Sequence, residues 1–307
     1  MTTLRAALLA AIAGALAISV PAAAQEAPDS GQPTAAQAGD DILVTGERPT
    51  HSEVTRQARD ITDIGSDIRD RPLARIEDRL CPGVIGLKLD AAQLMIDRIR
   101  WNADRFDVRQ GDDSNCTPNL IIAFVDDGKA ELAGLAERQP WLFQTLTRAE
   151  RERLLAEDGP VRVWTTAQMR TRDGMPIARQ ENLLDPPVVS MWMAHSKIYL
   201  TIREDITQVV VLFDKSGVRG KTVIQLADYA TMRSFARTRN AEGDAPLDTI
   251  LALFDASHEP PGGLTEFDQA YLRSVYDDIP NLPAITKING VAGELDDVLE
   301  EAADREE

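Results

Sequence analysis

The sequence predicts an α+β fold in which helices cover a mixed β-sheet. Two short apolar runs rich in β-branched residues, 119–125 and 208–213, have the length and composition of buried strands. Segments with apolar residues at helical spacing lie between and after these runs. The span 67–290, about 220 residues, is long enough to bury one core. We therefore expect a single α+β domain over 67–290.

Residues 1–24 have the pattern of a secretory signal peptide. Arg5 supplies the positive start, residues 6–20 form an apolar stretch, and Ala22-Ala23-Ala24 is a small-residue cleavage site. The apolar stretch is too short and too rich in alanine for a membrane span, and no later run reaches the necessary length. We expect cleavage after Ala24, export to the periplasm, and no membrane span in the mature chain.

The charge balance is strongly acidic, with a formal net charge of −17. Removal of residues 1–24 takes away one arginine and no acid, so the mature chain would carry −18. Nucleic-acid-binding domains need a basic face, so this balance predicts no nucleic-acid partner. It fits a well-solvated acidic surface and is compatible with basic partners.

Residues 25–66 form a lead that we expect to be disordered, because 25–40 contains almost no large apolar residue. Within this lead, residues 40–48 have the sequence DDILVTGER. The segment resembles the TonB box of outer-membrane receptors, which adds an extended strand to a partner sheet. The resemblance implies a TonB-type periplasmic domain as partner. The alternatives are a strand that packs on the protein's own domain, or a linker.

The chain has two cysteines, Cys81 and Cys116, an even number in a chain that we expect to be exported. A disulfide between them is therefore predicted. It would close a loop of about 35 residues and contribute about 3–4 kcal/mol to stability in the chain-entropy model. The loop encloses an expected helix at 90–106, for which Asp90 and Gln93 have the spacing of a capping box.

Local signals predict several further elements. Thr147 with Glu150 and Thr265 with Asp268 have the spacing of capping boxes at helix starts. Pro246 suits the first turn of another helix. We also expect strands at 161–165 and 188–194, a long surface loop at 171–187, and an acidic tail at 291–307.

Residues 196–239 hold the longest apolar run of the mature chain. Alternation at 198–203 and the run at 208–213 indicate two strands, and Asp205 begins the polar break between them, so a β-hairpin is expected. From Lys221 onward, the apolar residues recur at helical spacing.

The turn before this helix is similar to the end of a phosphate-binding loop. Gly220-Lys221-Thr222 follows a strand and opens a helix, but Lys215 stands where the motif needs its first glycine. We therefore predict no cofactor.

The helix after the expected hairpin and a later helix over Leu264–Tyr276 follow the layout of a zincin metalloprotease domain. Ala227–Thr231 (ADYAT) aligns with the zincin motif H-E-x-x-H, and the later helix is similar to the zincin pattern L-T-x-x-D-x-x-x-L-x-x-L-Y. The resemblance implies a zincin-like scaffold in which Asp228 keeps the place of the general base. Zinc needs three protein ligands, and both histidine slots lack an imidazole, so no metal is implied. Asp228, Tyr229 and Thr231 would then lie near any inherited cleft.

The three histidines, His51, His195 and His258, are too scattered for a metal site. His195 precedes Ser196, but adjacent residues on a strand point to opposite faces, so the two form no catalytic pair. We predict a hydrogen-bonding role for His195. The remaining catalytic hypothesis is a hydrolase in which His195 and Asp228 act.

As a whole, the chain resembles a family of exported alphaproteobacterial proteins, which implies location and fold but no activity. We predict a non-catalytic periplasmic binding or interaction protein on a metal-free zincin-like scaffold. Two alternatives stay open: a hydrolase with an unrecognised active site, and a TonB-linked accessory factor for outer-membrane uptake.

Overall fold

The computed structural model describes residues 48–64, 67–112, 115–177, 196, 198–241, 245–257, 259–277 and 279–306. Met1–Glu47 and Arg48–Glu307 separate into two units, and the described residues all belong to the second. The expected signal peptide, nearly all of the TonB-box-like segment, the expected strand at 188–194, His195 and His258 therefore lie outside the described residues.

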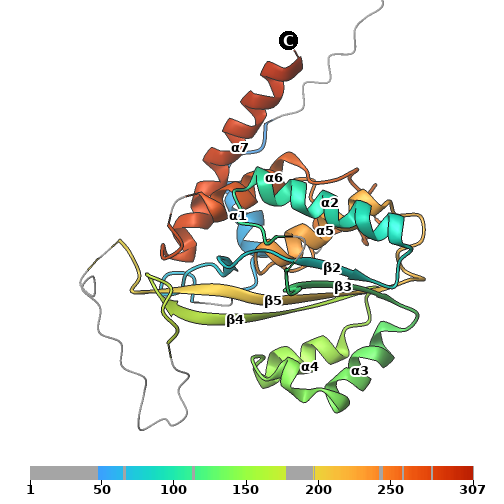
Figure 1. Cartoon of the computed structure of the whole chain (residues 1–307). Helices are drawn as coiled ribbons and strands as arrows, with labels where there is room; N and C mark the ends of the chain where they lie inside the picture. Colours follow the sequence, from blue (N-terminus) through green and yellow to red (C-terminus); the bar gives the residue numbers. More distant parts are fainter. Residues whose placement is uncertain are drawn as a thin grey trace, which may run out of the picture. The chain divides into compact units, whose positions relative to one another are not determined.

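Strand β5 (Ile202–Asp214) is the centre of a mixed five-stranded sheet. It pairs in parallel with β3 (Leu120–Val125) and with the short β1 (Arg75–Ile76), and β3 pairs in parallel with β2 (Pro82–Ile85). On its other side β5 pairs antiparallel with β4 (Val161–Thr171). Helices lie above and below these strands in Figure 1. The predicted mixed sheet covered by helices is confirmed.

One face of the sheet carries the main hydrophobic core. Figure 1 shows α1, α2, α5 and α6 on this face, and the core also includes residues of α7. Phe213 of β5 stacks 5.0 Å from Phe124 of β3 and lies 6.1 Å from Tyr229 of α5 (ring centroids), which ties the helix layer to the strands. These helices are α1 (His51–Ile61), α2 (Leu89–Arg105), α5 (Val223–Phe235), α6 (Glu266–Tyr276) and α7 (Ala284–Glu306).

The opposite face is covered by a smaller layer, visible below the sheet in Figure 1. It consists of α3 (Gly128–Arg138), the 3₁₀ helix η1 (Pro140–Phe143) and α4 (Arg148–Ala156). Phe143 packs 5.3 Å from Trp164 of β4 (ring centroids), so this layer is anchored on the antiparallel edge of the sheet.

Two of the three predicted capping boxes are present. Thr147 and Glu150 cap α4, and Thr265 and Asp268 cap α6, with both reciprocal hydrogen bonds in each case. The box expected at Asp90 and Gln93 is not formed, because α2 begins at Leu89 and its N-cap residue Lys88 makes no side-chain cap hydrogen bond. The helix expected from Pro246 is only the short 3₁₀ helix η2 (Ile250–Ala252).

The expected β-hairpin around Asp205 is not formed, because β5 runs without interruption through this residue. Asp205 is buried and pairs with Arg203 at 2.9 Å and with Arg170 at 3.1 Å. The neighbouring Glu204 is also buried and pairs with Arg71 at 2.7 Å. Arg203 of the same strand, Arg170 of β4 and Arg71 compensate the charges of these acids, so the polar residues do not need to form a solvent-exposed turn.

The helical layers extend past both expected domain boundaries. Helix α1 precedes residue 67 and places Val54, Ala58 and Ile61 in the core. Helix α7 continues through the expected acidic tail at 291–307, where Leu295 and Val298 are buried. The segment is helical despite its acidic composition, because its apolar residues recur at helical spacing and pack into the core.

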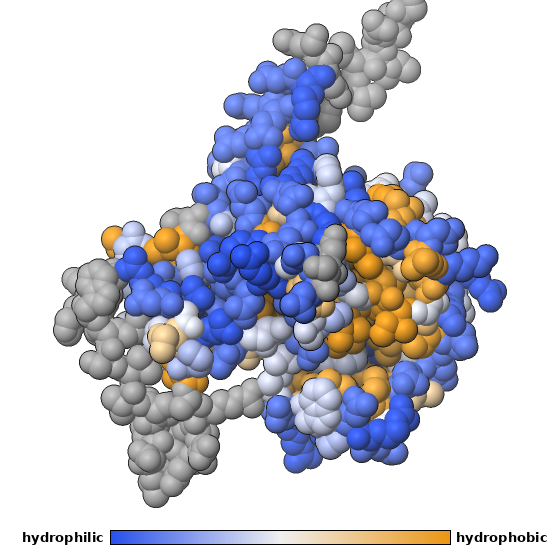
Figure 2. All heavy atoms as spheres, viewed as in Figure 1, coloured by the Kyte–Doolittle hydropathy of each residue, from blue (hydrophilic) through white to orange (hydrophobic). Residues whose placement is uncertain are grey.

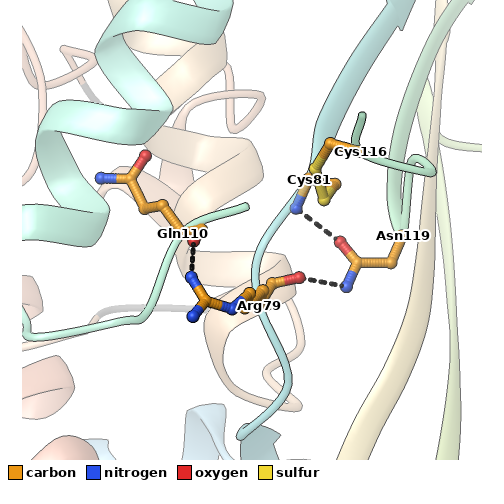
Figure 3. The surroundings of a disulfide bond; sticks show 5 residues. All are labelled: Arg79, Cys81, Gln110, Cys116 and Asn119. Atoms are coloured by element: carbon orange, nitrogen blue, oxygen red, sulfur yellow. Dashed lines mark hydrogen bonds between the residues drawn. A yellow bond between two sulfur atoms is a disulfide. The ribbon is translucent and has the colours of Figure 1, made fainter. Parts of the chain in front are cut away.

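The predicted disulfide between Cys81 and Cys116 is formed, and Figure 3 shows its surroundings. Asn119 sits beside it: its Oδ1 accepts from the Cys81 backbone N–H at 2.8 Å, and its Nδ2 donates to the Arg79 carbonyl at 3.0 Å. The bridge thus fixes the start of β2 to the segment that leads into β3.

Hydrophobic residues gather on one part of the surface shown in Figure 2, around the right-hand ends of α2 and β2 in that view. The exposed apolar residues of these elements include Ile85 on β2 and Leu89 at the start of α2. Hydrophilic residues cover α7 in the same view.

Candidate functional site

The carboxylate of Asp228 is tied to two other parts of the fold, helix α2 and the start of α6. Arg98 of α2 donates one hydrogen bond of 2.7 Å to each of its oxygens. Asn102 Nδ2 donates to Oδ1 at 2.8 Å, and the Leu264 backbone N–H donates to Oδ2 at 3.0 Å. The Asp228 side chain is 0% exposed. Asp228 therefore joins α5 to α2 and to the start of α6, and it lacks the access to substrate that a general base needs.

Tyr229 and Thr231 are buried on the same helix. The Tyr229 hydroxyl donates to Asn240 Oδ1 at 2.6 Å, and burial raises the pKa of this hydroxyl. Thr231 Oγ1 accepts from Asn102 Nδ2 at 2.9 Å. Neither these two residues nor Asp228 line any described cavity, so the structure does not bring the three together at a cleft.

The other residues considered for chemistry do not form a site among the described residues. His51 Nε2 lies 2.9 Å from Asp296 Oδ2 at the exposed surface. Over the described ranges, no group of three or more His, Cys, Asp or Glu side chains is placed to hold a metal ion. At the positions aligned with zinc ligands, Ala227 and Thr231 provide no imidazole, so these residues do not fit zinc.

The described residues do form a groove beside β4. Two adjoining cavities of about 290 Å³ and 270 Å³ share Asp63, Glu150, Arg153, Arg237 and Arg239. Helix α4 lines one side, and the end of α5 with the segment after it lines the other. Six arginines line the two cavities, which together we call the arginine groove: Arg71, Arg153, Arg162, Arg233, Arg237 and Arg239.

Four acids also line the arginine groove, and Arg237 binds three of them. Its guanidinium lies 2.8 Å from Glu150, 3.4 Å from Glu204 and 3.7 Å from Asp63. Burial by itself would lower the pKa of Arg237, but the Glu150 hydrogen bond and the nearby carboxylates raise it overall. Burial likewise opposes the ionisation of Glu150, but hydrogen bonds from Thr147 and Arg237 lower its pKa overall. Arg71 also binds Glu204, so two cations face three carboxylates at the centre of the groove.

Three arginines of the groove have no carboxylate partner among the described residues. Arg239 donates to the Thr62 carbonyl at 2.8 Å. Arg233 donates to Asn240 Oδ1 at 2.6 Å. Arg153 is exposed and has no polar partner within the described part of the chain. The lining as a whole has six arginines and four acids, so positive charge is in excess in the groove of an acidic protein. Arg153, Arg233 and Arg239 are therefore suitable partners for a ligand carboxylate or phosphate.

The sequence alone does not reveal this groove, because its arginines come from positions between 71 and 239. The one local signal is the close spacing of Arg233, Arg237 and Arg239 around the C-terminal end of α5. This signal is weak, because basic residues are common near helix C-termini for electrostatic reasons.

Comparison with known protein families, curated proteins and solved structures finds no match to the chain. None of the described helices is both long and apolar enough to cross a membrane.

Proposed function

We propose that the protein is a non-catalytic binding protein that holds an anionic ligand in the arginine groove. The observation that carries this proposal is the set of three arginines, Arg153, Arg233 and Arg239, without carboxylate partners. A ligand carboxylate or phosphate would complete their charge-assisted hydrogen bonds.

The composition of the groove favours binding over catalysis. The described lining residues include no histidine, cysteine, serine or lysine. Glu150 and Glu204 are held by Arg237, and the lowered pKa of Glu150 makes it a weak base.

The metal-free zincin-like scaffold is part of the same proposal. It is supported by the sequence resemblance and by the position of α5 directly after β5, with α6 packed against α5. Export to the periplasm rests on residues 1–24, and a TonB-linked role rests on residues 40–48. Both stay predictions.

The proposal is tested by titrating the purified mature protein with citrate and with pyrophosphate in a calorimeter. We expect binding that weakens as salt concentration rises, and at least tenfold weaker binding in an Arg153→Ala/Arg239→Ala variant. The matched control is Arg148→Ala, an exposed arginine on α4 outside the groove. Equal affinity in all three proteins, or no binding of either anion to the wild type, would contradict the proposal.

A further inference from the structure

The outer edge of β4 is unpaired along the arginine groove. Among the described residues, β4 pairs with β5 on one side, and no strand pairs with its other side at Val161–Thr165. Further along β4, the edge is covered, because Thr171 N–H donates to the Met175 carbonyl at 2.8 Å and Ile177 N–H donates to the Met169 carbonyl at 3.2 Å. An uncovered strand edge presents free hydrogen-bonding groups to an additional strand.

The register identifies which backbone groups face outward. The Asp214 N–H donates to the Pro160 carbonyl at 2.9 Å, so even-numbered residues of this part of β4 bond to β5. In an antiparallel pair the bonded positions alternate. The N–H and C=O groups of Val161, Val163 and Thr165 therefore point away from β5, toward the free edge.

This free edge and the arginines without carboxylate partners belong to the same cavity. Val161, Val163 and Thr165 line the larger of the two cavities together with Arg153 and Arg233. Arg153 comes from α4, in the layer on one face of the sheet, and Arg233 comes from α5 on the opposite face. The cations therefore flank the strand edge from both faces.

We propose that the ligand of the arginine groove is an extended acidic peptide segment that adds a strand to the free edge of β4. Its backbone would bond to Val161, Val163 and Thr165, as in other cases of β-strand addition. Side chains of an extended strand alternate between the two faces, so acidic residues on both faces would meet Arg153 on one side and Arg233 with Arg239 on the other. This inference rests on the proposed function and specifies its ligand.

Two other occupants fit less well. A compact anion would satisfy arginines on one face and leave the backbone groups of β4 unpaired over about 16 Å of strand, from the usual rise per residue. A second copy paired through the same edge would bring two positively charged grooves together, and like charges in contact are unfavourable.

The test uses a threonine octapeptide with glutamate at positions 3, 4 and 5 as the probe, because an extended strand then carries two carboxylates on one face and one on the other. Citrate serves as the compact anion. We expect the peptide to bind to the wild type and to bind at least tenfold more weakly to a Val163→Pro variant. Proline at position 163 removes an N–H that faces outward and leaves the bonds between β4 and β5 in place. Citrate should bind equally to both proteins, which also shows that the variant is folded.

Two N-methylated forms of the peptide provide a test that needs no variant. One form carries methyl groups on the odd residues and the other on the even residues. A paired strand presents alternate N–H groups to its neighbour, so one form should lose at least tenfold in affinity and the other should bind like the parent peptide.

The outcomes separate this inference from the proposed function. Citrate binding without peptide binding, or peptide binding insensitive to both N-methylation patterns, overturns the strand-addition inference and keeps the anion groove. The strand-addition inference is also overturned if the wild type sediments as a dimer and the Val163→Pro variant sediments as a monomer, because a second copy would then occupy the edge of β4. Failure of both citrate and peptide to bind contradicts the proposed function as well.

Discussion

The guanidinium of Arg98 lies 4.3 Å from the ring centroid of Trp101 while its nitrogens bind both oxygens of Asp228. The aromatic ring and the carboxylate hold the same cation from two sides. Trp101 is one residue before Asn102, which also donates to Asp228. One turn of α2 thus supplies most of the surroundings of this buried charge.

We expect Asp228→Asn to lower the free energy of unfolding by about 3 kcal/mol, because the variant leaves Arg98 without its ionic partner at a mostly buried position. Urea denaturation measures the change. The control is Asp297→Asn on the exposed side of α7, which should change stability by less than about 0.5 kcal/mol. Equal unfolding midpoints for the wild type and Asp228→Asn would show that the carboxylate is not a structural anchor.

Asp268 makes the stability dependent on pH. Burial raises the pKa of this carboxyl group from 3.8 to about 6. The folded state then binds the proton more tightly than the unfolded state, so this stabilising contribution is complete below about pH 3.8 and is lost as the pH rises through 6.

The comparison is between the wild type and Asp268→Asn, which does not titrate. We expect the difference in their free energies of unfolding to shift by about 2 kcal/mol between pH 4.5 and pH 7, with the wild type losing stability relative to the variant. Chemical denaturation at the two pH values measures this shift. A difference that is the same at both pH values would exclude a raised pKa.

Loss of the disulfide should destabilise the protein substantially. We expect Cys81→Ala/Cys116→Ala to lower the free energy of unfolding by about 3–4 kcal/mol, since the bridge closes a loop with a sequence separation of 35 residues. Urea denaturation of the variant and of the wild type with reductant should give similar midpoints. No change after reduction would contradict the expected contribution of the bridge.

The energetic cost of adding a side chain at Gly111 should depend on the disulfide. A Cβ atom at this position would overlap the sulfur atoms of both Cys81 and Cys116. Gly111→Ala should therefore cost about 1–3 kcal/mol in the oxidised protein and much less in the Cys81→Ala/Cys116→Ala background. Gly293→Ala on α7 has no neighbour within 4 Å of the new Cβ and is the control. The same cost in both backgrounds would place the strain elsewhere.

The features that the sequence predicted well depend on residues close together or on a unique pairing. A capping box needs only two residues three positions apart, and Thr147 with Glu150 meets that requirement without help from the rest of the fold. The disulfide followed from there being only two cysteines. The mixed sheet followed from the apolar runs that became β3 and β5.

The features that the sequence did not predict depend on contacts between distant residues. Arg98, which forms an ion pair with Asp228, is 130 residues away in the sequence. The sequence of α5 alone therefore gives no sign that this carboxylate is buried in an ion pair. Asp205 suggested a turn for the same reason, because Arg170 of β4 pairs with it only in the folded sheet. The arginine groove could not be predicted, since Arg153 and Arg239 meet only after α4 and the end of α5 are placed.

Helices α1 and α7, the first and last described helices, pack against each other, and His51 near the start of α1 contacts Asp296 of α7. Val54 and Ile61 share one core with Ile288 and Leu295. A nascent chain that has emerged only as far as α6 therefore exposes the apolar side of α1 to solvent. Completion of this core must wait until α7 has been synthesised, so the shorter nascent chain is prone to aggregation until then.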